Sequence, residues 1–132
     1  MSKKIIKLNQ MQLRSLLENL AGPILSEATR ADALRVAGEG VVRQIMGYDG
    51  QLMLVKVKFE KRAKGALHTH YHTQTTYVAS GKFEFSVDGE MQIVEAGDGI
   101  YIAPDAEHEC TCIETGILID CFSPMRADFI SK

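Results

Sequence analysis

The chain has 132 residues, the usual size of a single domain that closes its own hydrophobic core. Hydrophobic residues make up 45% of it and charged residues 24%, which is ordinary for a soluble globular protein. The net charge is only −2, and the lysines and arginines are scattered. This argues against a nucleic-acid partner, because such a partner needs a basic stripe.

The lengths of the apolar runs indicate where in the cell we expect the protein. Lys3, Lys4 and Lys7 make a small basic start, but no apolar run of signal-peptide length follows them. No stretch approaches the roughly 20 apolar residues needed to cross a bilayer. We therefore expect a cytoplasmic protein with no membrane partner.

Residues 9–21 predict the one amphipathic helix of the chain. Asn9 is a good N-cap and Gln12 stands three positions later, as in a capping box. Four leucines then recur at helical spacing, and a Gly-Pro pair ends the pattern. The leucines are Leu13, Leu16, Leu17 and Leu20. We expect residues 1–33 to form a helical extension whose leucine stripe packs on the main domain or on a second subunit of a homodimer.

From about residue 34 the sequence consists of short apolar runs separated by glycine-containing turns. Asp88-Gly89 lies between two such runs and predicts a tight hairpin. Many short strands with no helix-length insertion favour an all-β sandwich or barrel over residues 34–132. The expected strands are Leu34–Val36, Val41–Met46, Leu52–Phe59, Thr76–Ala79, Phe83–Val87, Met91–Val94, Ile100–Ile102, Glu109–Ile113 and Gly116–Phe122.

The histidines are concentrated in one short stretch. His68, His70 and His72 alternate, so they share one face if residues 68–72 are extended. Gln74 follows them, and His108 stands alone after a Gly-Asp-Gly…Pro turn. Neutral imidazole is the commonest transition-metal ligand, so these residues predict a metal site, although exposed histidines are also common.

The late part of the chain carries cysteines and one unusual aspartate. Cys110, Cys112 and Cys121 are odd in number, which favours reduced, buried thiols over disulfides, with soft-metal ligation as the alternative. Asp120 lies between Leu118 and Phe122 on the same face of its expected strand. A carboxylate on an apolar, inward face is costly unless it is paired or functional.

Two motifs now carry a family resemblance. GALHTHYHTQTTYVASG resembles the first cupin motif, G-x-x-H-x-H-x-x-x-[E/Q]-x-x-x-x-x-x-G, and GDGIYIAPDAEH resembles the second, G-D-x…P…H. The resemblance implies a cupin double-stranded β-helix, an antiparallel jelly-roll barrel, with a metal at its mouth. It makes one divalent transition metal (Zn, Ni, Fe, Mn or Co) the expected cofactor, and it implies four ligands, His68, His70, Gln74 and His108. His72 is left to the pocket or the surface.

Two longer segments sharpen the resemblance. YDGQLMLVKVKFEKRAKGALHTHYHTQ and IDCFSPMRADFI resemble the KdgF-type pectin-degradation cupins, in which the corresponding runs are typically ALHSHPHEQ and DVFSPPREDFL. This likeness covers roughly residues 40 to 130 and implies an enzyme of uronate catabolism. Members of this family open 4,5-unsaturated uronate monosaccharides to linear 4-deoxy-5-keto-uronates, an isomerase-type reaction.

The tail motif implies the roles of three further residues. Asp120 is the expected acid and base, Phe122 the aromatic residue beside the sugar, and Arg126 the group for the uronate carboxylate. The expected partner is thus a small sugar acid. Two other functions stay open, a non-catalytic sugar-acid-binding cupin and a metal-dependent cupin oxygenase.

Overall fold

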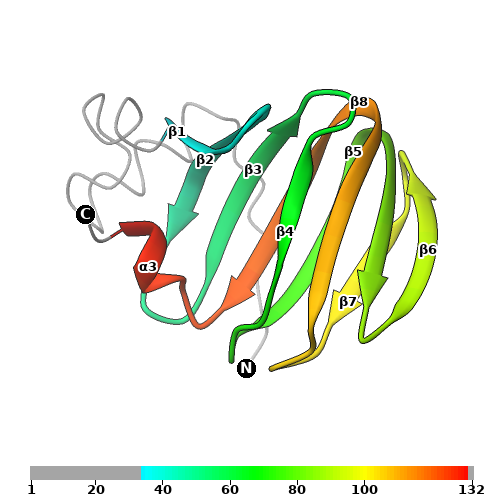
Figure 1. Cartoon of the computed structure of the whole chain (residues 1–132). Helices are drawn as coiled ribbons and strands as arrows, with labels where there is room; N and C mark the ends of the chain where they lie inside the picture. Colours follow the sequence, from blue (N-terminus) through cyan, green and yellow to red (C-terminus); the bar gives the residue numbers. More distant parts are fainter. Residues whose placement is uncertain (1–33, 131–132) are drawn as a thin grey trace, which may run out of the picture.

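The computed structural model describes residues 34–130, and strands dominate them (Figure 1). The predicted helix over 9–21 and the extension 1–33 lie outside the described residues, so both stay predictions. The elements are β1 (Leu34–Gly38), β2 (Val41–Tyr48), β3 (Met53–Phe59), β4 (Lys64–His68), β5 (Thr73–Val87), β6 (Glu90–Glu95), β7 (Gly99–Ile102), β8 (His108–Ser123) and the one-turn helix α3 (Ala127–Ile130).

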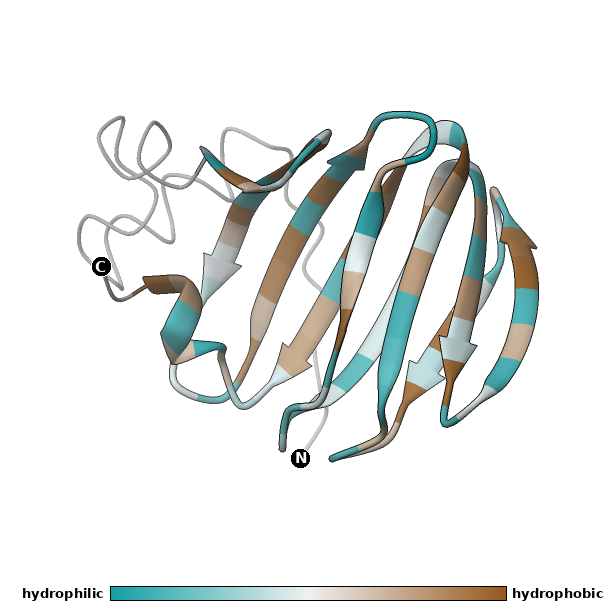
Figure 2. Cartoon of the chain, viewed as in Figure 1, coloured by the Kyte–Doolittle hydropathy of each residue, from teal (hydrophilic) through white to brown (hydrophobic). Residues whose placement is uncertain are grey.

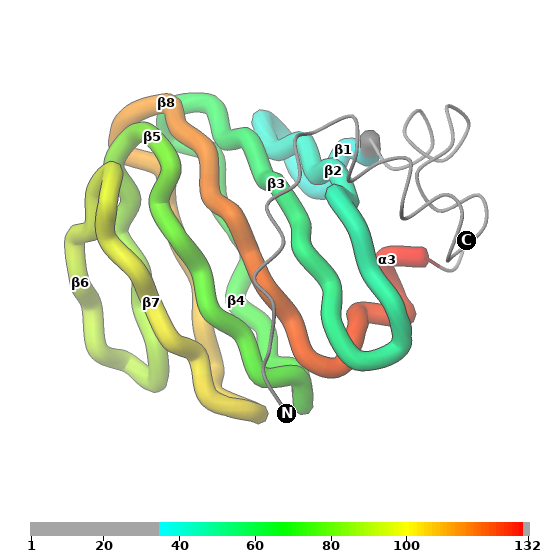
Figure 3. The backbone as a smooth tube through the Cα atoms, turned by 180° about the vertical axis from the view of Figure 1, so that it is seen from behind, coloured from blue at the N-terminus to red at the C-terminus, as the bar shows by residue number. Residues whose placement is uncertain are grey.

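Two long strands, β5 and β8, form the centre of the barrel. They pair antiparallel along their whole length, from Thr73 opposite Ser123 to Val87 opposite His108. The first half of β8 also pairs with β4 and its second half with β3. Likewise β5 pairs first with β7 and then with β6. All eight strands therefore belong to one sheet, which folds over at β5 and β8 and curves around one interior, as the front and back views show (Figures 1 and 3). The predicted all-β antiparallel barrel is confirmed.

Glycines mark the bend of the two long strands. Gly81 has φ +82°, and a Cβ placed on it would lie 2.6 Å from the Glu114 carbonyl oxygen, so a side chain does not fit between the strands here. The pairing of β5 with β8 shifts register at this point. The sequence predicts each of these long strands as two shorter strands that are separated at the bend. The structure joins them, because the glycine lets the backbones approach and the pairing continue.

The hairpin between β5 and β6 follows its sequence closely. Asp88 has φ 50° and Gly89 has φ 85°, so both central residues are left-handed, as a type I′ turn requires. The predicted tight turn is confirmed.

Alternating side chains fill the interior and cover the outside, which gives the banded strands of Figure 2. In β3 the buried Met53, Val55, Val57 and Phe59 alternate with partly or fully exposed residues. The other large side chains of the core come mainly from the two long strands. They include Val78, Phe83, Phe85, Cys112, Leu118 and Phe122.

The cysteines are free thiols, as predicted. Cys110 and Cys112 are buried on the inward face of β8, whereas Cys121 is partly exposed. Burial raises the pKa of Cys110 to about 12, so it stays a protonated, apolar filler. Among the residues described here, no helix has the length and apolar character of a membrane span.

Candidate metal centre and its pocket

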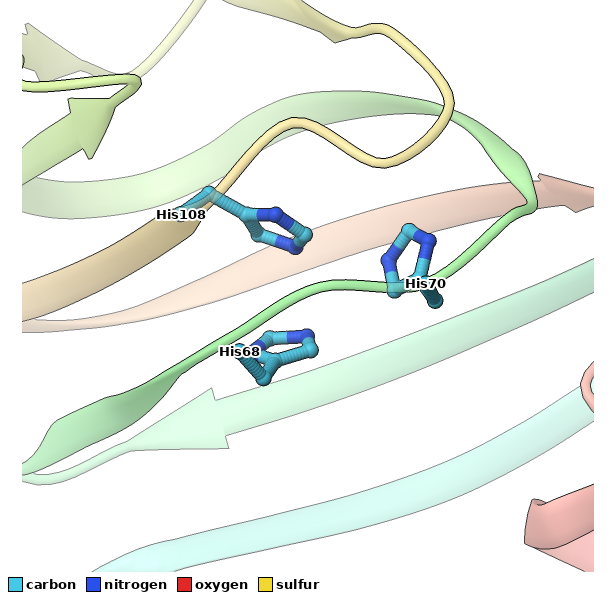
Figure 4. Close-up of side chains that lie close together, drawn as sticks. All are labelled: His68, His70 and His108. Carbon is cyan, nitrogen blue, oxygen red and sulfur yellow. The ribbon is translucent and has the colours of Figure 1, made fainter.

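Three histidines converge at one end of the barrel (Figure 4). One ring nitrogen from each of His68, His70 and His108 lies within 4.8 Å of the other two. His68 ends β4 and is paired with His108, the first residue of β8, while His70 lies in the loop after β4. The pairing of β4 with β8 therefore brings together two motifs that are far apart in sequence.

His72 does not join this group. β4 ends at His68, so residues 68–72 do not form one extended run, and the alternation that would place His72 on the same face as the others is lost. The His72 side chain is buried, with 5% exposure, and its ring stacks on Tyr71 at a centroid distance of 4.1 Å. The ring also meets the rings of His70 and Phe122 edge-on, at centroid distances of 5.3 and 6.4 Å. It is therefore an interior packing residue, neither a member of the metal group nor a surface histidine.

Each of the three converging rings is held by its Nδ1. A backbone carbonyl only accepts hydrogen bonds, so the Nδ1 that faces one carries the proton and Nε2 keeps a lone pair. The three rings thus present their Nε2 atoms to the shared space. The Nδ1 contacts are His68 to Ala66 O at 2.7 Å, His70 to His72 O at 3.2 Å and His108 to Ala106 O at 2.9 Å.

The protonation of these rings suits a cation. Burial lowers the pKa of His108 to about 4 and also lowers the pKa of His70, so both imidazoles are neutral at pH 7. The Nε2 of His108 is buried and has no hydrogen-bond partner in the described part of the chain. A buried lone pair without a donor is unfavourable, and a bound metal ion would satisfy it.

Gln74 adds an oxygen to the same space. Its Oε1 lies 2.9 Å from the Nε2 of His70, whose Nδ1 also faces an acceptor. A neutral imidazole has a single N–H, so it cannot donate to both oxygens. A cation between Nε2 and Oε1 resolves this contact. Three imidazoles and one amide oxygen are a ligand set that suits Zn, Ni, Fe, Mn and Co.

Thr76 and Asp120 fix the orientation of that amide. The Gln74 Nε2 donates to Thr76 Oγ1 at 2.9 Å, and the Thr76 hydroxyl donates to Asp120 Oδ1 at 2.7 Å. An ionised carboxylate only accepts, so the hydroxyl must point at Asp120 and its oxygen must accept from the amide N–H. Gln74 is therefore held with Oε1 toward His70. The strand register explains the contact, because Thr76 on β5 pairs with Asp120 on β8.

A cavity of about 260 Å³ adjoins the histidines. It is slightly below the ~300 Å³ lower end for pockets that take drug-sized ligands, so a small molecule is the matching occupant. The residues predicted as catalytic by resemblance, Asp120, Phe122 and Arg126, line the same cavity as His68. Its lining also includes Gln74, His108, Arg43 and Phe129.

Asp120 is an acid of this cavity with a shifted pKa. Burial raises the pKa of its carboxyl from 3.8 to about 6, against the smaller opposing effects of the Thr76 hydrogen bond and the Arg126 charge. Such a carboxyl changes its protonation state just below neutral pH.

Arg126 has one edge already occupied. Its Nε and Nη2 donate to the two carboxylate oxygens of Asp128 at 3.0 and 2.8 Å, which lowers the pKa of Asp128. The guanidinium also lies over the rings of Phe122 and Phe129, at 5.0 and 4.2 Å from their centroids. Nη1 is the donor group of Arg126 that remains for a ligand.

Sequence reasoning missed two polar residues here, Thr76 and Arg43. Thr76 stands two positions after Gln74 and so shares its face of β5, a signal that is readable once Gln74 is proposed as a ligand. Arg43 lies between the apolar Val41 and Ile45 on the same face of β2. A charge on an inward face was the signal that singled out Asp120, and it applies equally to Arg43.

Known proteins resemble the chain in sequence and in fold. A family model described as a cupin domain matches residues 55–119. The pectin degradation protein KdgF of Dickeya dadantii is 42% identical over 95 residues, which cover 70% of this chain and 86% of that protein.

Two solved structures agree with this relationship. An RmlC-like cupin from Shewanella frigidimarina superposes with a TM-score of 0.71 at 43% identity, over 73% of this chain and 86% of that one. KdgF from a Halomonas species superposes with a TM-score of 0.69 at 34% identity, over 72% and 88%. The chain therefore belongs to the cupin superfamily and, within it, to the cupins of the KdgF type.

Proposed function

We propose that the protein is a metal-dependent enzyme that opens 4,5-unsaturated uronate monosaccharides to linear 4-deoxy-5-keto-uronates. The observation that carries the proposal is the cavity itself. It places Asp120, a carboxyl that titrates near neutral pH, beside the converging histidines and beside arginine side chains that suit a sugar acid. The similarity to pectin degradation protein KdgF points to the same substrate class.

The reaction moves one proton within the substrate, which neither gains nor loses atoms. The ionised Asp120 takes the proton from the hemiacetal hydroxyl, the bond between that carbon and the ring oxygen breaks, and an aldehyde forms. The ring oxygen keeps the electron pair of the broken bond and is left as the oxygen of an enolate. Protonated Asp120 then returns the proton to C4, which makes the 5-ketone. A positioned acid and base of this kind contributes roughly 10²–10⁴-fold.

The other cavity residues bind and orient the sugar. Phe122 offers a ring face against which the sugar packs, and Arg126 offers its free Nη1 to the carboxylate. A divalent ion held by His68, His70, Gln74 and His108 would supply Lewis-acid polarisation of a substrate oxygen.

The direct test follows the conjugated alkene of 4,5-unsaturated galacturonate. Metal-loaded protein should remove its ultraviolet absorbance faster than buffer, in the absence of oxygen consumption. No acceleration, with metal shown to be bound, would refute the proposed activity. Oxygen uptake that depends on bound Fe(II) would favour the oxygenase instead.

A substitution separates an enzyme from a sugar-acid-binding protein. Asp120→Asn should lower turnover by roughly 10²–10⁴-fold while the sugar acid still binds. Glu114→Gln removes a carboxylate from the same strand at an exposed position outside the cavity lining, and should leave turnover unchanged. Equal loss in both variants would contradict the role of Asp120.

A further inference from the structure

Arg43 is a cation inside the barrel without an anionic partner. It lies on β2 opposite Val57, lines the cavity, and its guanidinium carbon is 3.7 Å from the centroid of the Phe129 ring. Its Nε is buried and makes no hydrogen bond. Within residues 34–130, no carboxylate forms an ion pair with it. Arg43 is half-buried, and a partly desolvated charge without an ionic partner is unfavourable unless a ligand pairs with it.

The neighbouring charges do not neutralise it. Burial lowers the pKa of Arg43, and the positive charge of Arg126, which stacks on the same Phe129 ring, lowers it further. Asp128 is the carboxylate with an opposing effect, but both of its oxygens already accept from Arg126. Arg43, Arg126 and Asp128, the arginine group, therefore carry one net positive charge, and Arg35, opposite Arg43 on β1, adds a further repulsion.

The stacking on Phe129 orients the guanidinium of Arg43. A planar guanidinium that lies over a ring keeps the N–H donors on its edges available. These donors suit the paired oxygens of a carboxylate, which they can bind in a bidentate manner. The corresponding edge of Arg126 is filled by Asp128, whereas no side chain of the described residues fills that of Arg43.

We propose that Arg43 is the principal carboxylate-binding residue of the cavity and selects sugar acids over neutral sugars. Arg126 assists through its Nη1 and is held in place by Asp128. The inference rests on the proposed function for the identity of the sugar, but the recognition of a carboxylate can be measured without turnover.

The test compares the binding of D-galacturonate with that of D-galactose, which lacks the carboxylate, by titration calorimetry on metal-loaded protein. Wild type should prefer galacturonate. Arg43→Met should weaken galacturonate binding roughly 10- to 100-fold, the range for hydrogen bonds to charged groups, and leave galactose binding almost unchanged. Arg43→Lys should restore part of the loss.

Lys58→Met is the matched control. Lys58 is an exposed cation of β3 that pairs with Val42, the residue before Arg43, so the variant removes the same charge from the outer face. It should bind both sugars as wild type does. Metal content and the thermal midpoint should be unchanged in Arg43→Lys, which shows that its binding defect is not a folding defect.

Two results would overturn the inference: equal affinity of wild type for the two sugars, or Arg43→Met binding galacturonate as tightly as wild type. Failure of the proposed function has a different signature. In that case galacturonate binds in an Arg43-dependent way, which supports the inference, but the unsaturated uronate is not opened. If the enzyme is active, Arg43→Met should raise KM more than it lowers kcat.

Discussion

The histidine group and the arginine group of this cavity are built in different ways. In the first, defined by His68, His70 and His108 with Gln74, ring orientation is set by contacts within two residues along the chain. In the second, Arg43 comes from β2, while Arg126 and its neighbours follow β8. Their orientation depends on stacking with Phe129 and on the pairing with Asp128.

This difference has a consequence for function. Local backbone contacts hold the histidines ready for an ion, and their burial keeps two of them neutral. The arginines instead form a charged site that is completed by an anion. The first group is therefore suited to holding a permanent cofactor, and the second to a ligand that comes and goes.

The largest expected effect comes from breaking the histidine group. His68→Ala removes a proposed ligand at an exposed position, so it should lower metal affinity at least ~100-fold and abolish turnover without unfolding the protein. Metal content after gel filtration measures this. His72→Gln is the control from the same segment and should retain its metal. Equal metal loss in both variants would mean that the group is wrongly defined.

Asp120 stands between the two groups and sets a pH dependence. The reaction begins with its carboxylate, so kcat/KM should fall about tenfold per pH unit below its pKa of about 6. A profile that stays flat from pH 7 to pH 4.5 would contradict this role.

The same carboxyl affects stability. Its folded pKa of about 6 lies above the ordinary 3.8, so the folded state binds more protons between these values and loses stability as pH rises through that window. Asp120→Asn removes this cost and should stabilise the protein at pH 7 by about 1–3 kcal/mol, measured by urea unfolding. A destabilised variant would argue that the carboxylate is a structural anchor.

A smaller effect is expected where Thr76 connects Asp120 to Gln74. Thr76→Val keeps the shape but removes both hydrogen bonds, so the amide is free to turn and metal affinity should fall about tenfold. Thr76→Ser keeps the hydroxyl and should retain wild-type affinity in a competition titration with a chelating dye. A valine variant with unchanged affinity would show that Thr76 does not position Gln74.

The smallest effect on either group is expected from the outside of the barrel. We propose a homodimer that uses the leucine stripe predicted over residues 9–21. Leu54, Tyr77 and Tyr101 are exposed on the outer face of the barrel and give an apolar surface for association. Deleting residues 1–25 should lower the mass in solution from dimer to monomer and leave metal content unchanged. An unchanged mass would place the subunit contact elsewhere.

Sequence reasoning recovered most of the fold because strand periodicity and turn chemistry are local. The Asp88-Gly89 turn and the inward faces of β3 and β8 follow directly from neighbouring residues. It failed where continuity depends on distant partners. At Gly81 the sequence predicts a gap between two strands, whereas in the structure pairing with β8 keeps β5 continuous.

The sequence by itself determined the all-β fold and the residues of the histidine group. Two short motifs contain these residues, and their spacing and side-chain chemistry are local properties. Only the tertiary structure decided the rest of the site. It placed His72 in the interior rather than at the surface. Strand register connects Asp120 to Gln74 through Thr76. Asp128 binds Arg126, so Arg43 has no ionic partner among the described residues. Contacts between distant strands depend on register and burial, which no local pattern encodes.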